Sequence, residues 1–582
     1  MAHPPSTQPG NDPAQPRGSR LRQAAPWLLA GLLLLLGFPQ LDQYNVTWDE
    51  ALGDLFFGER YLSWFTSFDP VYLDFDADPY PEDRSPDLRA SPFRTRPWEY
   101  YPLINVLGAA STALLHRSLG LLDPFDAFHA VNLVLAALFV VFLYRFVEHR
   151  RGAGEAVLAV LLVFTAPRVV VHLLANTKDF PELVLFSAAA LVFAAALERG
   201  SLRFLLLAAA LTGAALATKA NALFLAPVFL VAVLWTRAWV RFGWRRLLLG
   251  AAAATAIVLA IAFAAWPYLW AAPIERAALH LQYISGQVDQ VRHESLLSPL
   301  GAIAFTTPLP WLLLCVAGLV PTLRGALQRQ PLDVVLLAWI AVTVGRMYLP
   351  GAVNFDGVRH FLELFVALAL VAARGARWIA EAVAQRLGDR VRGGTRTHFA
   401  VIALIAVLAH LAPTVRLHPH QIAYWNALTG GTDGAFARGL PQAGDYWGLS
   451  YRQGLRWLNE NAEPASRLGV PIVEHAVRVT APTRLRSDIQ LLDLSSPGSP
   501  RIPPEFVGYL LQMAATEPQR PVYVMFVRRD DWTNPVIEFC RSQLEPVHEI
   551  VVDGARILEI HRLPVLDLES VRRPTTDNGA PG

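Results

Sequence analysis

Residues 24–38 read AAPWLLAGLLLLLGF, and residues 44–50, shortly after them, read YNVTWDE. The first run is apolar and close to the length of a membrane span. We interpret it as a retained anchor and not as a signal peptide, because no small-residue cleavage site follows it and many more apolar runs do. The second stretch then places two adjacent carboxylates, Asp49 and Glu50, where the chain leaves the membrane.

The composition is that of a polytopic membrane protein. Of the 582 residues, 53% are hydrophobic and only 17% are charged, and the mean hydropathy is +0.33, well above a soluble protein of this size. The net charge of +2 gives no global basic field, so we expect no nucleic-acid partner. The two cysteines, Cys315 and Cys540, indicate neither a disulfide framework nor a zinc site.

Further apolar stretches of spanning length recur along the chain and, with the first run, predict about eleven spans. They lie near residues 128–146, 153–173, 181–197, 203–218, 222–236, 247–268, 302–320, 332–349, 358–380 and 398–413.

The apolar segment 102–115 decides the topology, because every later loop would change to the other side of the membrane if this segment crossed it. If it does not cross, five arginine-rich connections fall on the side of the N-terminus, as the positive-inside rule requires. These connections lie near 145–151, 199–203, 237–246, 324–329 and 374–396. We therefore predict a juxtamembrane or re-entrant helix at 102–115 and a cytoplasmic N-terminus. Outside the membrane we place 41–127, the turns near 174–180, Lys219 and 350–358, the loop 270–300, and the tail from Arg416.

The fold class predicted is mainly α, a polytopic helical membrane bundle with a small C-terminal extracytoplasmic α/β domain. We expect a disordered cytoplasmic leader at 1–23, the membrane domain at 24–415, the α/β domain at 416–565 and a disordered tail at 566–582. The tail domain contains a helical pattern at Arg452–Asn461 and an Asp553-Gly554 hairpin turn. Its strand-like runs are Leu468–Val473, Asp488–Leu494, Pro521–Arg528 and Val547–Ile560.

The outer loop begins with a helix signal. Thr47-Trp48-Asp49-Glu50 matches a capping box, with Thr47 as N-cap and Glu50 at the third helical position. An interfacial helix should follow. Its apolar face would be Leu52, Leu55, Phe56, Leu62 and Phe65, and its polar face Asp54, Glu59 and Arg60.

Asp49 is the first candidate for chemistry. The alternative is a helix-start residue whose carboxylate is favoured by the helix dipole. Because Thr47 and Glu50 already satisfy the cap, Asp49 is a second acid that the cap does not need. For Glu50 the capping interpretation is the stronger one, and a catalytic role stays open.

Five more ionisable residues lie at the outer ends of spans, where charge is costly and usually functional. They are Lys178, Asp179, Lys219, Arg359 and His360. Snorkelling of a cation to the interface is the alternative for any one of them. The positive-inside rule predicts few cations on the outer side, so several of them there need another reason. Binding of an anionic ligand would supply that reason.

In order and topology these motifs resemble bacterial family 39-like glycosyltransferases of the GT-C superfamily, the broad group of protein O-mannosyltransferases and the aminoarabinose transferase of lipid A. The resemblance rests on the acidic pair, the Lys178-Asp179 turn, the Lys219 turn, Asp356-Gly357-Val358-Arg359-His360, and the tail motifs Tyr424–Leu428 and Asp445–Gly448. One motif departs from the family: this chain has Tyr100-Tyr101-Pro102 where many relatives have His-Pro-Pro.

The resemblance implies a GT-C-like enzyme of the bacterial plasma (inner) membrane that works on cell-envelope glycans. It would transfer a hexosyl or pentosyl group from a polyprenyl-phosphate donor to a lipid, glycan or protein acceptor on the outer face. Asp49 would act as general base in an inverting displacement. Lys219 and Arg359 would bind the donor phosphate, assisted by His360 or Lys178.

Asp179 would orient the acceptor or, with Asp49, hold a divalent cation such as Mg or Mn. We expect no other cofactor, and membrane lipids as surroundings. A transporter or flippase of lipid-linked saccharides is the main alternative. It predicts charges spread through the bilayer depth and repeat symmetry, whereas here the charges gather at one face and no repeat is visible. A sensor or assembly protein would leave Asp49 replaceable.

Overall fold

The computed structural model describes residues 17–565 except 78, 81–90, 287–297, 350–351, 353–355, 388–393, 495–501 and 531. The expected disorder at 1–16 and 566–582 lies outside the described residues. Residues 17–23, expected in the disordered leader, are instead the first turns of α1 (Arg17–Gly37). Arg, Leu, Gln and Ala are good helix formers, so the apolar helix extends backwards through them.

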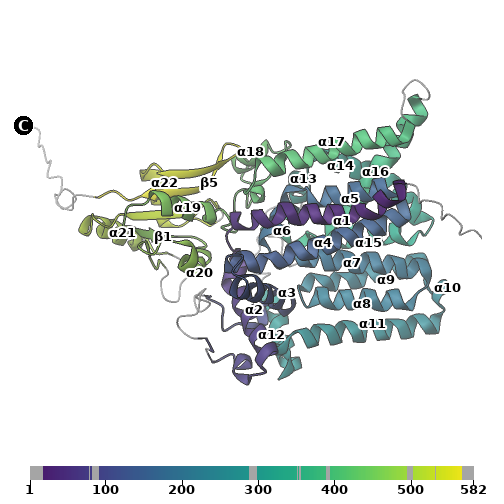
Figure 1. The fold of residues 1–582 in the computed structure, drawn as a ribbon, viewed down its shortest axis with the longest axis horizontal. Helices are drawn as coiled ribbons and strands as arrows, with labels where there is room; N and C mark the ends of the chain where they lie inside the picture. Colours follow the sequence, from purple (N-terminus) through teal and green to yellow (C-terminus); the bar gives the residue numbers. More distant parts are fainter. Residues whose placement is uncertain are drawn as a thin grey trace, which may run out of the picture.

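A bundle of helices forms the larger part of the molecule, and most of them run along its long axis (Figure 1). Each predicted apolar stretch is helical. The helices are α1, α4 (Pro124–Arg151), α5 (Ala153–Phe164), α6 (Pro167–Ala175), α7 (Asp179–Arg199), α8 (Leu202–Leu216), α9 (Leu225–Thr236), α11 (Trp244–Ala265), α13 (Ser298–Thr306), α14 (Leu309–Leu327), α15 (Pro331–Arg346), α16 (Leu364–Leu387) and α17 (Gly394–Arg416). Proline breaks two of the stretches, at Pro167 and at Pro308.

The predicted number of eleven crossings is not confirmed. Among the described residues, six helices are long and apolar enough to cross a membrane, or seven if α5 and α6, bent by 67°, form one span. The helix α8 has 15 residues and α9 has 12. At a rise of about 1.5 Å per residue, such helices fall short of a hydrocarbon core of about 30 Å.

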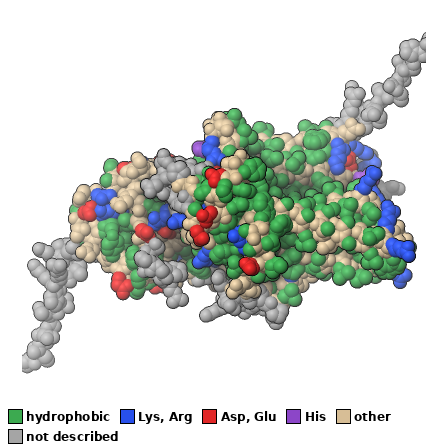
Figure 2. All heavy atoms as spheres, turned by 90° about the horizontal axis from the view of Figure 1, so that it is seen from below, with side chains coloured by type: hydrophobic (Ala, Val, Ile, Leu, Met, Phe, Trp, Pro, Cys, Tyr) green, Lys and Arg blue, Asp and Glu red, His purple; other side chains and the backbone are tan. Residues whose placement is uncertain are grey.

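The two ends of the bundle differ in the way the sequence predicts. Lys and Arg side chains gather at the end away from the C-terminal domain, where α10 (Trp239–Phe242) lies (Figures 1 and 2). The opposite end carries α2 (Leu55–Ser67), α3 (Pro102–Thr112) and α12 (Pro273–Gly286), beside the C-terminal domain. The segment 102–115 thus lies at this end of the bundle, with the long helix α4 after it.

The helix predicted after Thr47 is present, but its polar face is not solvated. A π-helix over Glu50–Asp54 runs into α2, and Asp54, Glu59 and Arg60 are all buried. Arg60 donates hydrogen bonds to the carbonyls of Val71 and Tyr72, so the chain after α2 folds back over the helix. These internal contacts replace the water that an interfacial helix would face.

The C-terminal region contains a five-stranded sheet of order β2-β1-β3-β5-β4. Its strands are β1 (Arg467–Gly469), β2 (Gln490–Leu491), β3 (Val522–Val527), β4 (His548–Val552) and β5 (Ala555–Arg562). The β1 strand pairs in parallel with β2 and β3, whereas β5 pairs antiparallel with β3 and β4. The helices are α18 (Gly431–Ala437), α19 (Tyr451–Asn461), α20 (Glu474–Arg484), α21 (Glu505–Thr516) and α22 (Pro535–Gln543).

The predicted hairpin turn joins β4 to β5. Asp553 and Gly554 both have positive φ, 47° and 87°, as a two-residue type I′ turn requires. The fold class predicted from the sequence, a helical membrane bundle with a small C-terminal α/β region, is confirmed.

Candidate active site

The capping box at the start of the outer loop forms as predicted. The Thr47 amide donates to Glu50 Oε2 at 2.9 Å, and the Glu50 amide donates to Thr47 Oγ1 at 3.3 Å. Glu50 also contacts His129 Nε2 at 3.0 Å and accepts from the Thr177 amide and hydroxyl at 3.1 and 2.7 Å. Because both oxygens of this buried carboxylate are engaged, we expect Glu50 to fix the loop to α4 and to the turn before α7.

The π-helix after Asp49 brings a second acid to the site. In this helix residues five apart lie on one face, and Asp49 and Asp54 both approach Lys178. The Lys178 Nζ lies 3.7 Å from Asp49 Oδ2 and 3.9 Å from Asp54 Oδ2. Asp54 Oδ1 also accepts a hydrogen bond of 2.7 Å from Asn105. The sequence places Asp54 on the polar face of an interfacial helix and gives no sign that it joins this site, because residue spacing does not reveal a π-helix.

Tyr100, in the motif that departs from the family, packs against this π-helix. Its ring centroid lies 5.7 Å from the Lys178 ammonium, a cation–π contact. A Cβ at Gly53 would lie 2.4 Å from the Tyr100 ring, so only glycine permits the approach. The aromatic residue therefore takes part in fixing the Lys178 side chain.

Arg359 is the centre of the cluster. Its Nη1 donates to Asp49 Oδ2 at 2.7 Å and lies 3.9 Å from Asp179 Oδ2, and its Nη2 lies 3.2 Å from Asp356 Oδ2. The guanidinium also faces the Trp447 ring at 5.0 Å from the centroid. One side chain thus joins acids from the first outer loop, from α7 and from the turn before α16.

Lys219 completes the group through Asp179, whose Oδ1 it contacts at 2.5 Å. Asn176 donates to the other oxygen of Asp179 at 2.8 Å. His360 is adjacent to Arg359, and its carbonyl accepts hydrogen bonds from Asn221 and Arg346. Asp49, Lys178, Asp179, Lys219 and Arg359, which are far apart in the sequence, therefore form one connected cluster.

The charges around Asp49 decide its basicity. Burial would raise the pKa of the Asp49 carboxyl, but Arg359 and Lys178 outweigh burial and hold this pKa below its usual range. The side chain of Asp49 is 24% exposed, whereas those of Asp54 and Asp179 are 1% exposed. Asp49 is the acid of the cluster that a substrate can reach.

Asp49 and Asp179, the two acids expected to hold a divalent cation, are already paired with cationic side chains. Asp49 and Asp179 both face the Arg359 guanidinium. Within the described ranges, no group of three or more His, Cys, Asp or Glu side chains is arranged to hold a metal. A role for Mg or Mn stays a prediction from the resemblance, and no step below depends on it.

A further arginine enters the cluster from the C-terminal region. Arg529, two residues after β3, places Nη2 3.0 Å from Asp356 Oδ1. Its guanidinium also lies 5.3 Å from the ring centroids of Trp48 and Trp532. The sequence alone does not identify Arg529 as a site residue, since its separation of 173 residues from Asp356 leaves no local pattern. The charged run at its position, Arg528-Arg529-Asp530, was the one available signal.

Asp54 predicts a pH dependence of stability. Burial raises the pKa of this carboxyl to about 7, although Lys178 counteracts it. Its contribution to stability is therefore complete below the unfolded pKa of about 3.9 and is lost as pH rises through about 7. Between these two pKa values the free energy of unfolding of the wild type should fall by about 1.4 kcal/mol per pH unit. Asp54→Asn keeps an oxygen that accepts from Asn105 but does not titrate, so we expect it not to show this fall.

Thermal unfolding of purified wild type and Asp54→Asn at pH 5 and pH 8 measures this effect. The midpoint of the variant should exceed that of the wild type more at pH 8 than at pH 5. The exposed Asp76→Asn on the same loop is the matched control and should follow the wild type. A constant difference between Asp54→Asn and wild type at the two pH values would contradict the prediction.

Comparisons with known proteins give a family match for part of the chain. Residues 114–266 match the family model of dolichyl-phosphate-mannose-protein mannosyltransferase. No curated protein matches the chain. Similar solved structures include ArnT from Cupriavidus metallidurans bound to undecaprenyl phosphate, at 16% identity over 92% of this chain and 97% of that one, with a TM-score of 0.48.

Two further structures are similar at lower scores. The apo state of the same ArnT covers 95% of this chain and 100% of its own, at 15% identity and a TM-score of 0.45. The match to an Archaeoglobus fulgidus oligosaccharyltransferase complex with Zn and sulfate covers 74% of this chain and 59% of that one, at 14% identity and a TM-score of 0.41. The family match over residues 114–266 confirms the resemblance of this membrane protein to family 39-like glycosyltransferases of the GT-C superfamily.

Proposed function

We propose that this protein transfers a sugar from a polyprenyl-phosphate donor to an acceptor hydroxyl at the membrane face that carries the C-terminal domain. The observation that carries the proposal is the convergence of Asp49 with Lys178, Lys219 and Arg359. One reachable carboxylate beside three cations provides both a base and a site for a phosphate. The family match agrees, because the family is named for dolichyl phosphate mannose, which is a polyprenyl-phosphate sugar.

The reaction is a single displacement. The acceptor oxygen forms a bond to the anomeric carbon while the bond from that carbon to the phosphate oxygen breaks. Asp49 takes the proton of the acceptor hydroxyl as general base. The negative charge that develops on the leaving lipid phosphate is stabilised by Arg359, with Lys178 and Lys219. The attack comes from the face opposite the leaving group, so the anomeric configuration is inverted.

Donor binding activates the base. Without donor, the ion pair with Arg359 keeps the pKa of Asp49 low, and such a carboxylate is a weak base. A donor phosphate competes for Arg359 and Lys178 and thereby releases Asp49 from its cations. The acceptor then meets a more basic carboxylate than the free protein has. Asp49 therefore becomes an effective base once donor is in place.

Asp179 and Asp356 are positioning residues in this scheme. Asp179 holds Lys219 at 2.5 Å and is itself held by Asn176. Asp356 holds Arg359 through Nη2, whereas Asp49 contacts Nη1. Both acids keep the cations in place when the phosphate draws them from Asp49. Glu50 supports the loop and does not meet the substrate.

The difference in charge between the two ends of the bundle supports a proposed location. The arginine-rich end faces the cytoplasm of a bacterial plasma (inner) membrane, and the N-terminus lies on that side. The cluster and the C-terminal domain lie on the extracytoplasmic side. No nucleotide-sugar pool exists there, so a membrane-bound donor suits the site. The acceptor is a lipid, glycan or protein that carries a hydroxyl group.

The test supplies purified protein in nanodiscs with a set of polyprenyl-phosphate sugars and follows release of the free lipid phosphate. Release that depends on protein and on an added acceptor is the expected result. The competing flippase function is tested by reconstituting the protein in vesicles with a labelled lipid-linked saccharide. Movement of the intact saccharide across the bilayer without release of lipid phosphate would overturn the proposal.

A further inference from the structure

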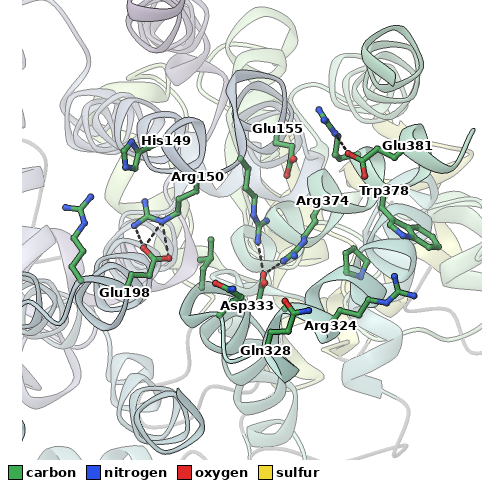
Figure 3. Close-up of a pocket in the computed structure, with 17 residues that line it drawn as sticks. His149, Arg150, Glu155, Glu198, Arg324, Gln328, Asp333, Arg374, Trp378 and Glu381 are labelled. Carbon is green, nitrogen blue, oxygen red and sulfur yellow. Dashed lines mark hydrogen bonds and ion pairs between the residues drawn. The ribbon is translucent and has the colours of Figure 1, made fainter. Parts of the chain in front are cut away.

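The proposed reaction leaves two features of the molecule unused, one at each end of the bundle. At the arginine-rich end, a cavity of about 690 Å³ contains ion pairs between helices (Figure 3). Arg150 on α4 pairs with Glu198 on α7, and Arg374 on α16 pairs with Asp333 on α15. These pairs join the helices that form the walls, so they have a structural role. The other feature is a pair of tryptophans beside the Asp49 cluster.

The aromatic pair, Trp48 and Trp532, brings together two distant parts of the chain. Trp48 directly precedes Asp49, and Trp532 belongs to the loop after β3 in the C-terminal region. Their ring centroids lie 5.2 Å apart, with the ring planes at 87°. Trp532 is 50% exposed. A half-exposed indole beside the one acid of the cluster that a substrate can reach is suited to contact that substrate.

Arg529 fixes the aromatic pair to the cluster. Its guanidinium lies 5.3 Å from each of the two ring centroids. The same guanidinium donates to the Tyr446 carbonyl at 2.9 Å and to Asp356 at 3.0 Å, and Asp356 in turn holds Arg359. The rings are therefore held in place relative to Asp49 before any ligand binds, which lowers the entropic cost of binding.

The surroundings of Trp532 face water, and their charges are paired. Arg528 lies 3.0 Å from Asp530, whose side chain is 48% exposed. A loop with these charges does not enter the hydrocarbon region, so Trp532 differs from an aromatic anchor in the bilayer. Glu474 and Arg478 on α20 also contact each other. With these charges satisfied, the aromatic pair offers a surface for a neutral ligand.

His475 adds a hydrogen-bonding group to this surface. Its ring lies edge-on to Trp48, with centroids 5.2 Å apart, and it is hydrogen-bonded to the Trp48 backbone. Burial lowers the pKa of the His475 ring to about 4, so the ring is neutral at pH 7. Its Nε2 has no hydrogen-bond partner among the described residues. Because one nitrogen of a neutral imidazole donates and the other accepts, Nε2 can accept a hydrogen bond from a hydroxyl group.

We propose that Trp48, Trp532 and His475 bind a neutral sugar ring of the acceptor, so that the acceptor is a saccharide. This inference rests on the proposed function and names its acceptor class. The C–H face of the sugar ring packs on Trp532, and a ring hydroxyl donates to His475 Nε2. Another hydroxyl of the acceptor reaches Asp49, which lies next to Trp48 in the chain.

The chemistry of a sugar ring matches this surface on two sides. Its axial C–H groups form a weakly positive apolar face that packs on the electron-rich face of an indole. Its edge carries neutral hydroxyl groups for a few polar partners, as in many small-molecule sites. A serine or threonine side chain offers a hydroxyl group without such a face, and a lipid phosphate adds a charge. The aromatic pair would leave both of these acceptors poorly bound.

The first test measures binding and needs no donor. Protein in nanodiscs is mixed with maltose, cellobiose or chitobiose, and saturation-transfer NMR detects contact with the ring C–H protons. Glycerol and a serine-containing tripeptide are the probes without a sugar ring. At least one disaccharide should bind, whereas glycerol and the tripeptide should not. Trp532→Ala should weaken that binding roughly five- to thirtyfold, and Trp532→Phe should be intermediate.

Tyr509→Ala is the matched control, because Tyr509 is a 53% exposed aromatic residue on α21, at the end of the C-terminal region away from the bundle. It should bind the disaccharide as the wild type does. Unchanged binding in Trp532→Ala would overturn the proposal, as would failure of all three disaccharides to bind. Equal binding of the tripeptide would overturn it too. If Trp532→Ala fails to fold, Trp532→Phe carries the test.

The second test uses lipid-phosphate release with the disaccharide as acceptor. Trp532→Ala should raise the KM for the acceptor and leave the single-turnover rate at saturating acceptor unchanged, because Trp532 does not meet the reacting atoms. An unchanged KM would overturn the inference. The two proposals fail separately. Disaccharide binding without any release would count against the transfer reaction alone, whereas release with the tripeptide as acceptor would count against the saccharide site alone.

Discussion

Asp49→Asn should lower the rate of lipid-phosphate release by about 100- to 10,000-fold, the usual contribution of a general base. The amide keeps the shape of the side chain but cannot take the proton of the acceptor hydroxyl. Donor binding should be unchanged or tighter, because Arg359 no longer pairs with a carboxylate at 2.7 Å. Single-turnover release and equilibrium binding of the donor, measured on the same protein, separate these two effects.

Asp76→Asn is the control, since Asp76 is an exposed acid on the same outer loop, outside the cluster. It should release lipid phosphate at the wild-type rate. Wild-type turnover in Asp49→Asn would end the assignment of Asp49 as the base. A large loss of donor affinity with an unchanged rate would instead make Asp49 a binding residue.

Replacement of Arg359 should lower the rate of lipid-phosphate release and weaken the binding of the product lipid phosphate. Loss of a cation at the site of developing charge costs about 100- to 1000-fold in rate. Arg359→Gln is expected to show this full loss. Arg359→Lys keeps the charge but cannot reach Asp49 and Asp356 with two nitrogens at once, so it should be intermediate.

The measurement is inhibition of release by free polyprenyl phosphate, together with the rate. Arg416→Gln is the control, because Arg416 is 62% exposed at the same side of the membrane and pairs with Asp553. Arg359 is buried among carboxylates, so Arg359→Gln can also lose stability; Arg359→Lys carries the test in that case. Unchanged inhibition by polyprenyl phosphate in Arg359→Lys and Arg359→Gln would remove Arg359 from the phosphate site.

Local patterns in the sequence account for the elements of the fold. Apolar runs predict each membrane helix, Thr47 and Glu50 predict the helix start, and Asp553-Gly554 predicts the hairpin. Each of these signals acts over a few residues, through burial, a cap or a positive φ. The number of crossings is harder to predict, because helices such as α8 lie in the bundle without the length to span it.

Contacts between distant segments account for most of the site. The sequence marks Asp49 and Arg359 as unusual charges, but their contact joins residues 310 positions apart. Asp54 was interpreted as a solvated residue, because the π-helix that turns it towards Lys178 has no signature in residue spacing. The direction of the pKa shift of Asp49 likewise depends on the positions of Arg359 and Lys178. The helix dipole lowers this pKa and burial raises it, so these two effects alone do not decide the direction.

The contact between Arg529 and Asp356 means that the membrane part and the C-terminal region do not form independent functional units. A shortened protein that ends after α17 would lose Arg529 and leave Asp356 with Arg359 alone. Inactivity of such a protein would therefore be no proof that the C-terminal region recognises the acceptor. Exchanging this region between relatives would change the catalytic cluster together with any specificity.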